Sequence, residues 1–169
     1  MRGMILSLLV IGAAVAVIYT LFIPHDDKGG SAVKRVDYRV ELLTARRAAP
    51  YQVAAPTGLP KTWKPTSVTY DGSDGHAWHL GFLDPHGEYV AVEQSTSPAK
   101  GYVTDVSQNA RDTGRTQEIA GRSWQRWTGG HYDALVSTEG GATTVVTGTA
   151  SRQDLTAMAA ALDFAGTKG

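Results

Sequence analysis

The five histidines are the first residues of this sequence to consider as chemically active groups. His76 and His79 are three residues apart, and two histidines at that spacing would converge on a metal ion if they lay on a helix. Asp74, Asp84 and His86 lie nearby. The surrounding glycines and proline instead indicate turns on either side of a short strand, where side chains alternate between faces. We therefore expect polar loop residues here, and we predict no metal site.

A hydrolytic site is no easier to find in the sequence. No serine stands in the G-x-S-x-G pattern of a nucleophile elbow, and no phosphate-binding loop is present. Glu88 and Glu93 fall on opposite faces of one predicted strand, so they would not oppose each other as a glycosidase pair does. We expect no enzyme, no catalytic residue and no cofactor. The alternative is an envelope hydrolase or transferase that uses a constellation scattered across the sheet, with a site that cannot be read from the sequence.

Two tryptophans offer a different kind of site. Trp124 and Trp127 fall on opposite faces of one predicted strand, so one of them faces away from the main core. Trp127, which Gly129 and Gly130 follow, is the candidate for exposure, and with Trp124 it marks a possible ligand or partner surface for a glycan or peptide. The alternative is that a helix or loops cover Trp127. Gln94 lies among apolar neighbours, where we expect backbone groups to satisfy its amide.

The element that must position any such site is the apolar run Met4–Ile23, which has no charge and no proline. As a helix it would be about 30 Å long, the thickness of a bilayer's hydrocarbon core. Ala14-Val15-Ala16 resembles a signal-peptidase site, but the apolar run continues beyond it, so we predict an uncleaved transmembrane anchor over residues 1–23. Gly12 and Ala16 form a small-xxx-small pair that would suit helix association, although both residues are also common in membrane helices.

The charges around this anchor bear on its orientation. Arg2 and the terminal amine favour an N-terminus inside the cell, whereas Lys28, Lys34 and Arg35 favour the opposite by the positive-inside rule. A long C-terminal domain can cross regardless of such charges. We expect the N-terminus inside and the domain outside the cytoplasmic membrane.

The composition excludes some classes of partner and bond. The formal net charge is +0, which argues against nucleic acid, and Cys is 0, which excludes disulfides and thiolate metal sites. About 140 residues follow the anchor, enough for one domain with its own core.

Hydrophobic periodicity predicts the order of elements. Residues 24–35 form a linker, and 36–49 fit a helix better than a strand. Seven strands are expected near 63–70, 78–82, 88–95, 116–119, 123–127, 133–137 and 143–149. After Ser97 the apolar residues are spaced as in a helix, although less regularly. Ser151 is expected to cap the final helix. The fold class is α+β: a transmembrane helix, then an antiparallel sheet of about seven strands with helices packed on one face. The domain spans residues 36–165, and 166–169 are a tail.

Several stretches together resemble a known family. They are FIPHDD, VDY, ARRAAPYQVAAPTGLPKTWKPTSVTY, WHLGF, YVAVEQS, GRSWQRW and TTVVTGTAS, in that order. The chain resembles the actinobacterial membrane-anchored family named domain of unknown function 4245. The resemblance implies a single-pass membrane protein with its domain outside the cytoplasm, and it supplies no catalytic residues because no activity is assigned to the family. We therefore expect binding or scaffolding at the cell envelope, with the lipid bilayer and an envelope protein or cell-wall ligand as partners.

Overall fold

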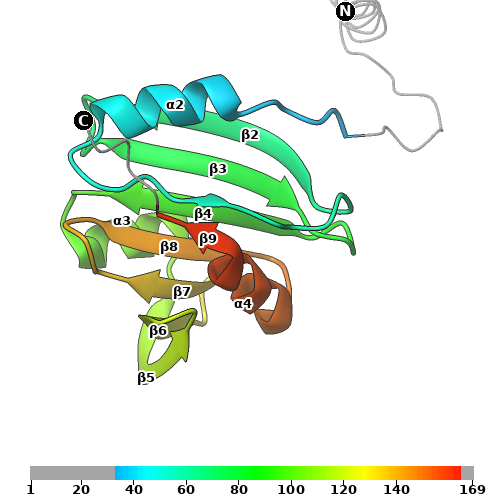
Figure 1. The fold of residues 1–169 in the computed structure, drawn as a ribbon. Coiled ribbons are helices and arrows are strands. Elements are labelled where there is room, and N and C mark those ends of the chain that lie inside the picture. The colour runs from blue at the N-terminus through cyan, green and yellow to red at the C-terminus, as the bar shows by residue number, and fades with distance from the viewer. Residues whose placement is uncertain (1–32, 165–169) are drawn as a thin grey trace, which may run out of the picture. The chain divides into compact units, whose positions relative to one another are not determined.

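The computed structural model of this protein describes residues 33–164. Three helices lie in this part, namely α2 (Arg39–Ala48), α3 (Ala99–Val106) and α4 (Arg152–Ala161). The strands are β1 (Ala55–Pro56), β2 (Lys64–Asp71), β3 (Ala77–Leu83), β4 (Tyr89–Ser95), β5 (Arg111–Ile119), β6 (Arg122–Thr128), β7 (Asp133–Ser137), β8 (Thr143–Gly148) and β9 (Leu162–Asp163). Figure 1 shows their arrangement.

Seven of these strands form one antiparallel sheet in the order β2-β3-β4-β8-β7-β6-β5. The prediction of a seven-stranded antiparallel α+β domain is confirmed. Two meanders, β2-β3-β4 and β5-β6-β7, are joined by β8, which lies between β4 and β7 although it follows both in sequence (Figure 1). A second sheet pairs only β1 with β9, a pairing between distant segments that the sequence did not indicate.

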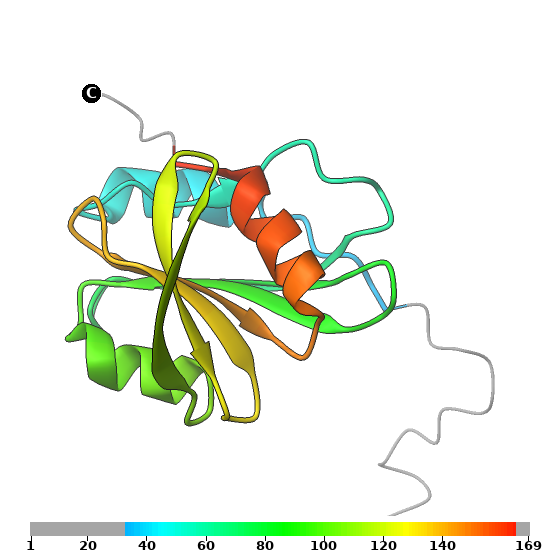
Figure 2. The same ribbon diagram turned by 90° about the horizontal axis from the view of Figure 1, so that it is seen from below.

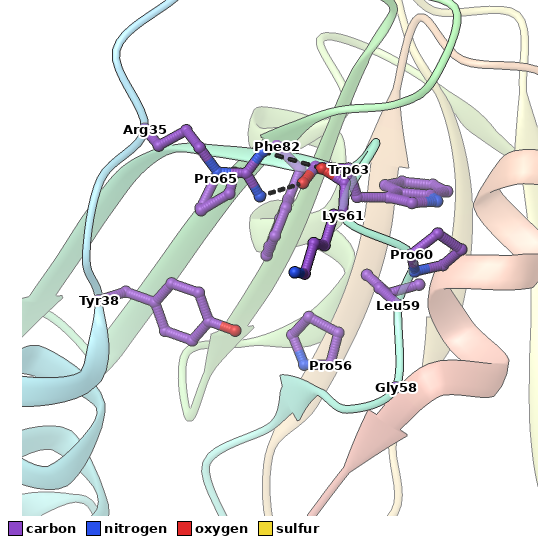
Figure 3. A pocket seen from close by; sticks show the side chains of 10 residues that line it. All are labelled: Arg35, Tyr38, Pro56, Gly58, Leu59, Pro60, Lys61, Trp63, Pro65 and Phe82. Carbon is purple, nitrogen blue, oxygen red and sulfur yellow. Dashed lines mark hydrogen bonds between the residues drawn. The ribbon is translucent and has the colours of Figure 1, made fainter.

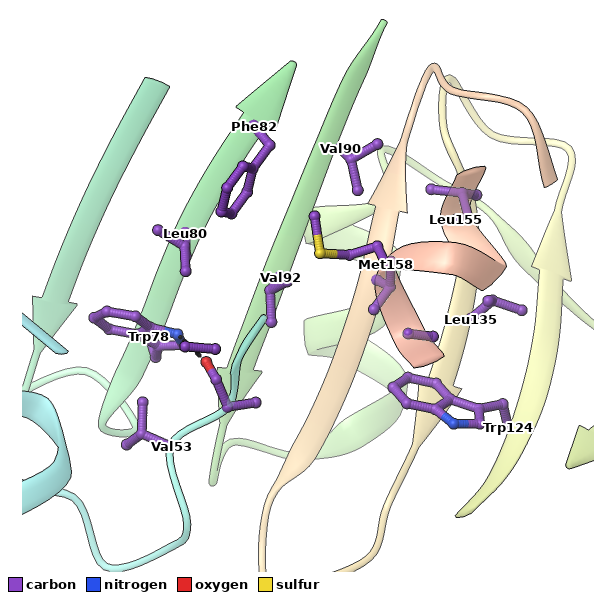
Figure 4. Packing of buried hydrophobic residues seen from close by; sticks show 14 of the residues in the cluster. Val53, Trp78, Leu80, Phe82, Val90, Val92, Trp124, Leu135, Leu155 and Met158 are labelled. Carbon is purple, nitrogen blue, oxygen red and sulfur yellow. Dashed lines mark hydrogen bonds between the residues drawn. The ribbon is translucent and has the colours of Figure 1, made fainter. Parts of the chain in front are cut away.

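The main core lies on the face of the sheet that α2 and α4 cover, which we call the first face. Alternate residues of β3 point there, namely Trp78, Leu80 and Phe82, and each is at most 3% exposed. Met158 and Leu155 of α4 lie over the neighbouring strands (Figure 4). Burying an apolar side chain of this size stabilises the folded state by roughly 1.5–3 kcal/mol.

The opposite face, the second face, is covered in part by α3. Val103 of that helix packs against Trp127, Val136 and Val145, and Figure 2 shows α3 across the sheet from α2 and α4. The prediction that the helices pack on one face is therefore wrong for α3. The physical reason lies in β8, which is buried along its whole length. A strand that is buried on both faces needs a covering element on each face, and α3 provides the cover on the second face.

A buried glutamine fixes the extended segment that precedes β1. Gln94 accepts a hydrogen bond from the Ala54 amide at 2.7 Å, and its own amide donates to the Gln52 carbonyl and to the Thr144 hydroxyl. The Trp78 indole donates to the Ala54 carbonyl at 3.0 Å. The expectation for Gln94 is confirmed, because the strand and this segment satisfy each other's buried polar groups.

The termini of the helices follow their local sequences. Ser151 caps α4 by accepting a hydrogen bond from the Asp154 amide, as the sequence predicts. The predicted helix over 36–49 is present as α2, which starts later than expected because Asp37 binds Arg39 at its start.

Between Val33 and Phe164, none of the helices is long and apolar enough to cross a membrane. The predicted anchor over 1–23 lies outside the described residues. So do Gly12, Ala16, most of the predicted linker and the predicted tail over 166–169.

Candidate functional site

A pocket of about 260 Å³ opens where the described chain enters the domain (Figure 3). Its lining contains three prolines, one at the end of β1, one in the loop that follows and one in β2, and each fixes its own φ, so the wall of the pocket is largely preformed. None of the described residues that line it is acidic, whereas two are cations. The lining residues are Arg35, Tyr38, Pro56, Gly58, Leu59, Pro60, Lys61, Trp63, Pro65 and Phe82.

The two cations of this pocket have different roles. The Arg35 guanidinium donates to the carbonyls of Lys61 and Trp63, at 2.9 and 2.7 Å, and so ties the entering chain to the loop. The Lys61 side chain points into the hollow in Figure 3, and no carboxylate between residues 33 and 164 forms an ion pair with it. Lys61 is therefore the cation of this pocket that remains available to a ligand.

Tyr38 adds a hydroxyl and a ring to the same pocket. Its ring meets that of Phe82 edge to face, with centroids 5.9 Å apart. Burial, and to a lesser extent the charge of Asp37, raises the pKa of the Tyr38 hydroxyl, which therefore stays protonated and can donate a hydrogen bond. The pocket offers an ammonium, a hydroxyl and apolar walls, a combination that suits an anionic group with an apolar portion.

A separate polar cluster lies on the second face, over strands β2, β3 and β4. Ser67, His79 and Glu93 come from these three strands in turn, and the register places His79 directly opposite Glu93. His79 Nε2 lies 2.7 Å from Ser67 Oγ, and His79 Nδ1 lies 2.6 Å from Glu93 Oε1. The carboxylate can only accept, so Nδ1 carries a proton and Nε2 of the neutral ring can accept from the serine hydroxyl.

The electrostatics of the cluster follow from these contacts. The hydrogen bond to Glu93 raises the pKa of His79, although burial opposes the rise. The side chains are 29% exposed for His79 and 13% for Glu93, so solvent reaches the imidazole while the carboxylate is largely sheltered.

Tyr89 and Gly81 complete the surroundings of Ser67. Burial raises the pKa of Tyr89 to about 12, and the interaction with the Ser67 hydroxyl acts in the opposite direction. A Cβ on Gly81 would meet the Ser67 hydroxyl and would lie 3.2 Å from the Tyr89 ring. Only a glycine at this strand position lets the serine hydroxyl and the tyrosine ring approach each other over the backbone.

Sequence reasoning did not find the Ser67–His79–Glu93 cluster. His79 lies on β3, within the strand predicted near residues 78–82, whereas His76 precedes that strand and contacts the Tyr70 hydroxyl at 3.1 Å. His86 is exposed in a turn, as expected. The missing information was the register, since the predicted meander would have aligned the polar positions of three strands had its pairing been worked out.

The structure separates the two tryptophans as the strand period predicts. Trp124 lies in the main core at 0% exposure, and Trp127 lies in the second-face cluster at 9%. Trp127 is therefore buried and not exposed, because α3 covers it, which was the alternative given for this residue. It nevertheless lines a hollow of about 450 Å³ with Lys100, Asn109 and Arg111, and its indole nitrogen has no partner within the described residues.

No grouping of three or more side chains suited to a metal ion occurs among residues 33–164.

The sequence was also compared with known proteins. A family model described as protein of unknown function, DUF4245, matches residues 1–162. The chain belongs to this family. Among curated proteins, none matches the sequence. Membership of DUF4245 supports the resemblance found in the sequence but assigns no activity to any residue.

Proposed function

We propose that this DUF4245 protein is a binding domain of the cell envelope. In this proposal, residues 1–23 anchor it in the cytoplasmic membrane and the domain faces outward, where its pocket binds an anionic group of an envelope protein or cell-wall ligand. The observation that supports binding is the pocket of Figure 3, in which Lys61 faces a preformed, largely apolar hollow without an acidic neighbour among the described lining residues.

The chemistry of the lining favours binding over turnover at this pocket. Its polar side chains are those of Arg35, Tyr38 and Lys61, and Arg35 is already engaged with backbone carbonyls. An ammonium and a hydroxyl next to proline and aromatic walls can hold a carboxylate and pack against its apolar substituent.

A binding titration tests the proposal. The full chain in lipid nanodiscs would be titrated with soluble peptidoglycan fragments, whose peptide stems end in carboxylates, by isothermal calorimetry. Lys61→Gln should weaken binding about tenfold or more, because a charged hydrogen bond contributes roughly 1.5–3 kcal/mol. Lys64→Gln is the matched control, since Lys64 is exposed nearby but does not line the pocket.

A second binding place has one observation in its favour, the unpartnered indole nitrogen of Trp127 beside the larger hollow. Trp127→Phe removes the N–H and keeps an aromatic ring. Loss of binding in this variant with full binding in Lys61→Gln would move the site to Trp127. Equal affinity in both variants and the wild type, or no binding of these fragments at all, would contradict the proposal.

The location of the domain has its own test. Protease added to intact cells stripped of their wall should digest the domain if it faces outward. Protection until lysis would contradict the proposed orientation.

A further inference from the structure

The Ser67–His79–Glu93 cluster contains the connections that a serine hydrolase needs. A hydroxyl is 2.7 Å from one nitrogen of an imidazole, whose other nitrogen is 2.6 Å from a carboxylate. These contacts link a nucleophile to a general base, and the base to a group that fixes its tautomer. Such a triad is recognised by geometry and not by sequence order.

We propose that Ser67, His79 and Glu93 form an acyl-transfer site that hydrolyses carboxylic esters. Ser67 is the nucleophile, His79 is the general base, and Glu93 is a positioning residue that acts through His79. This activity is separate from the binding proposed above, because the cluster lies on the second face of the sheet and the Figure 3 pocket includes Phe82 of the first face.

Tyr89 supplies what the triad alone lacks, a donor for the oxyanion. Its hydroxyl is within hydrogen-bonding reach of Ser67, and its pKa of about 12 keeps it protonated at neutral pH. The Tyr89 ring lies over Gly81, next to the attacking oxygen. A carbonyl bound above Ser67 would place its oxygen next to this hydroxyl.

The reaction proceeds in two balanced halves. Ser67 Oγ attacks the ester carbonyl carbon, its proton passes to His79 Nε2, and the oxyanion accepts a hydrogen bond from Tyr89. Collapse breaks the bond to the alkoxy oxygen, which leaves as an alcohol with the proton from His79. Water then attacks the acyl-serine and gives a proton to His79. The carboxylic acid leaves as that proton returns to Ser67.

The substrate class follows from the surroundings of Ser67. Among the described side chains beside Ser67, the Tyr89 hydroxyl is the donor that is not already part of the triad. One donor stabilises an oxyanion less than a hole with several donors, which favours an activated acyl compound over an amide. The His79 side chain is partly exposed, so such an ester can reach the imidazole from solvent.

A covalent probe is the first test. A fluorophosphonate should label the full chain at Ser67, forming a Ser–O–P bond with loss of fluoride, and peptide mass spectrometry locates the adduct. Ser67→Ala should abolish the labelling, and turnover of p-nitrophenyl acetate should fall by about 100-fold or more in Ser67→Ala and His79→Gln. The control Ser123→Ala alters an exposed strand serine and should change neither readout.

The absence of cysteine in the chain allows a second test that does not depend on turnover. In Ser67→Cys the sole thiol faces His79, so it should react with iodoacetamide at neutral pH about tenfold faster than the thiol of Ser123→Cys. Adding His79→Gln should remove the difference. No adduct at Ser67 together with equal thiol rates would overturn the proposal and leave the cluster as a structural ion pair.

Glu93 needs a readout that a structural role would not affect. Glu93→Gln should lower the pKa of His79, which NMR titration of the imidazole measures. The pH at which ester turnover reaches half its maximum should fall by the same amount. A turnover profile that stays in place while the NMR pKa moves would exclude His79 as the base.

Discussion

His79 on β3 faces Glu93 on β4 across a pair of hydrogen-bonded strands, with 2.6 Å between His79 Nδ1 and Glu93 Oε1. The contact is fixed by the register of the sheet, because the neighbouring residues Leu80 and Val92 pair in the core of the first face. A slip of β4 by one residue would move both Glu93 and Val92 to the wrong face.

The first prediction concerns how stability depends on pH. Glu93 raises the pKa of His79 in the folded state, so the stabilisation is fully present below the unfolded pKa of about 6.5 and is lost as pH rises through the higher folded pKa. Of the groups near His79, Glu93 provides the charge, while Ser67 and Tyr89 are neutral at these pH values. Tyr102 of α3 is also neutral, because burial, with a smaller effect of the Glu93 charge, raises its pKa. Glu93→Gln should therefore flatten the decline in unfolding free energy measured with urea from acid to alkaline pH.

The matched control for this prediction is His86→Gln. His86 is exposed in the turn before β4. Its replacement should leave the slope of stability against pH as in the wild type. A wild-type slope that survives in Glu93→Gln would show that another group is responsible.

The second prediction concerns Gln94. Replacing it with Leu removes the partners of the Ala54 amide and the Gln52 carbonyl, which lie in or beside the core. Each buried group left unsatisfied costs about 1–3 kcal/mol, so Gln94→Leu should lower the unfolding free energy by roughly 2–4 kcal/mol. Gln125→Leu, at an exposed glutamine of β6, should change it by less than about 0.5 kcal/mol. Equal urea midpoints for the two variants would contradict this account.

A third prediction uses the close approach at Gly81. In Gly81→Ala the new methyl group would meet the Ser67 hydroxyl and the Tyr89 ring, so Ser67 should turn away from His79. Fluorophosphonate labelling and stability should both fall. Gly72→Ala is the control, because its methyl group would come no nearer than 3.7 Å to other atoms.

Gly101 gives a fourth prediction, in the opposite direction. It lies inside α3, and a methyl group there would meet no atom within 4 Å among the described residues. Ala restricts the unfolded chain and suits a helix better, so Gly101→Ala should raise the unfolding free energy by about 0.5–1 kcal/mol. A lower thermal midpoint would mean that the glycine has a role in packing or binding at α3.

Much of this fold could be predicted from local sequence. The alternation of Trp78, Leu80 and Phe82 located β3, and the pairing of Ser151 with Asp154 located the start of α4. The side of the sheet that α3 covers could not be predicted in this way, since Val145 and Val146 are adjacent apolar residues of one strand and do not show which side of the sheet each faces.

The candidate sites depended on information that spacing does not contain. Ser67, His79 and Glu93 meet only once the register of two hairpins is known. The Figure 3 pocket combines Arg35 and Tyr38 with a loop that begins at Pro56, and nothing in either stretch indicates that the two meet. Trp127 was singled out correctly as facing away from the main core, but whether α3 would cover it depended on tertiary packing.

The position of β8 also bears on when this domain can fold. Each meander of three strands is made of neighbours in sequence, whereas the two meet only through β8, where Val92 pairs with Val146 and Leu135 pairs with the same residue from the other side. Closing such distant contacts is slow and comes after local pairing. During synthesis the two halves of the sheet therefore cannot pair with each other until residues 143–148 have emerged from the ribosome. Until then the inner edges, at β4 and β7, remain unpaired. A chain arrested before that point would hold two unjoined sheets and no domain.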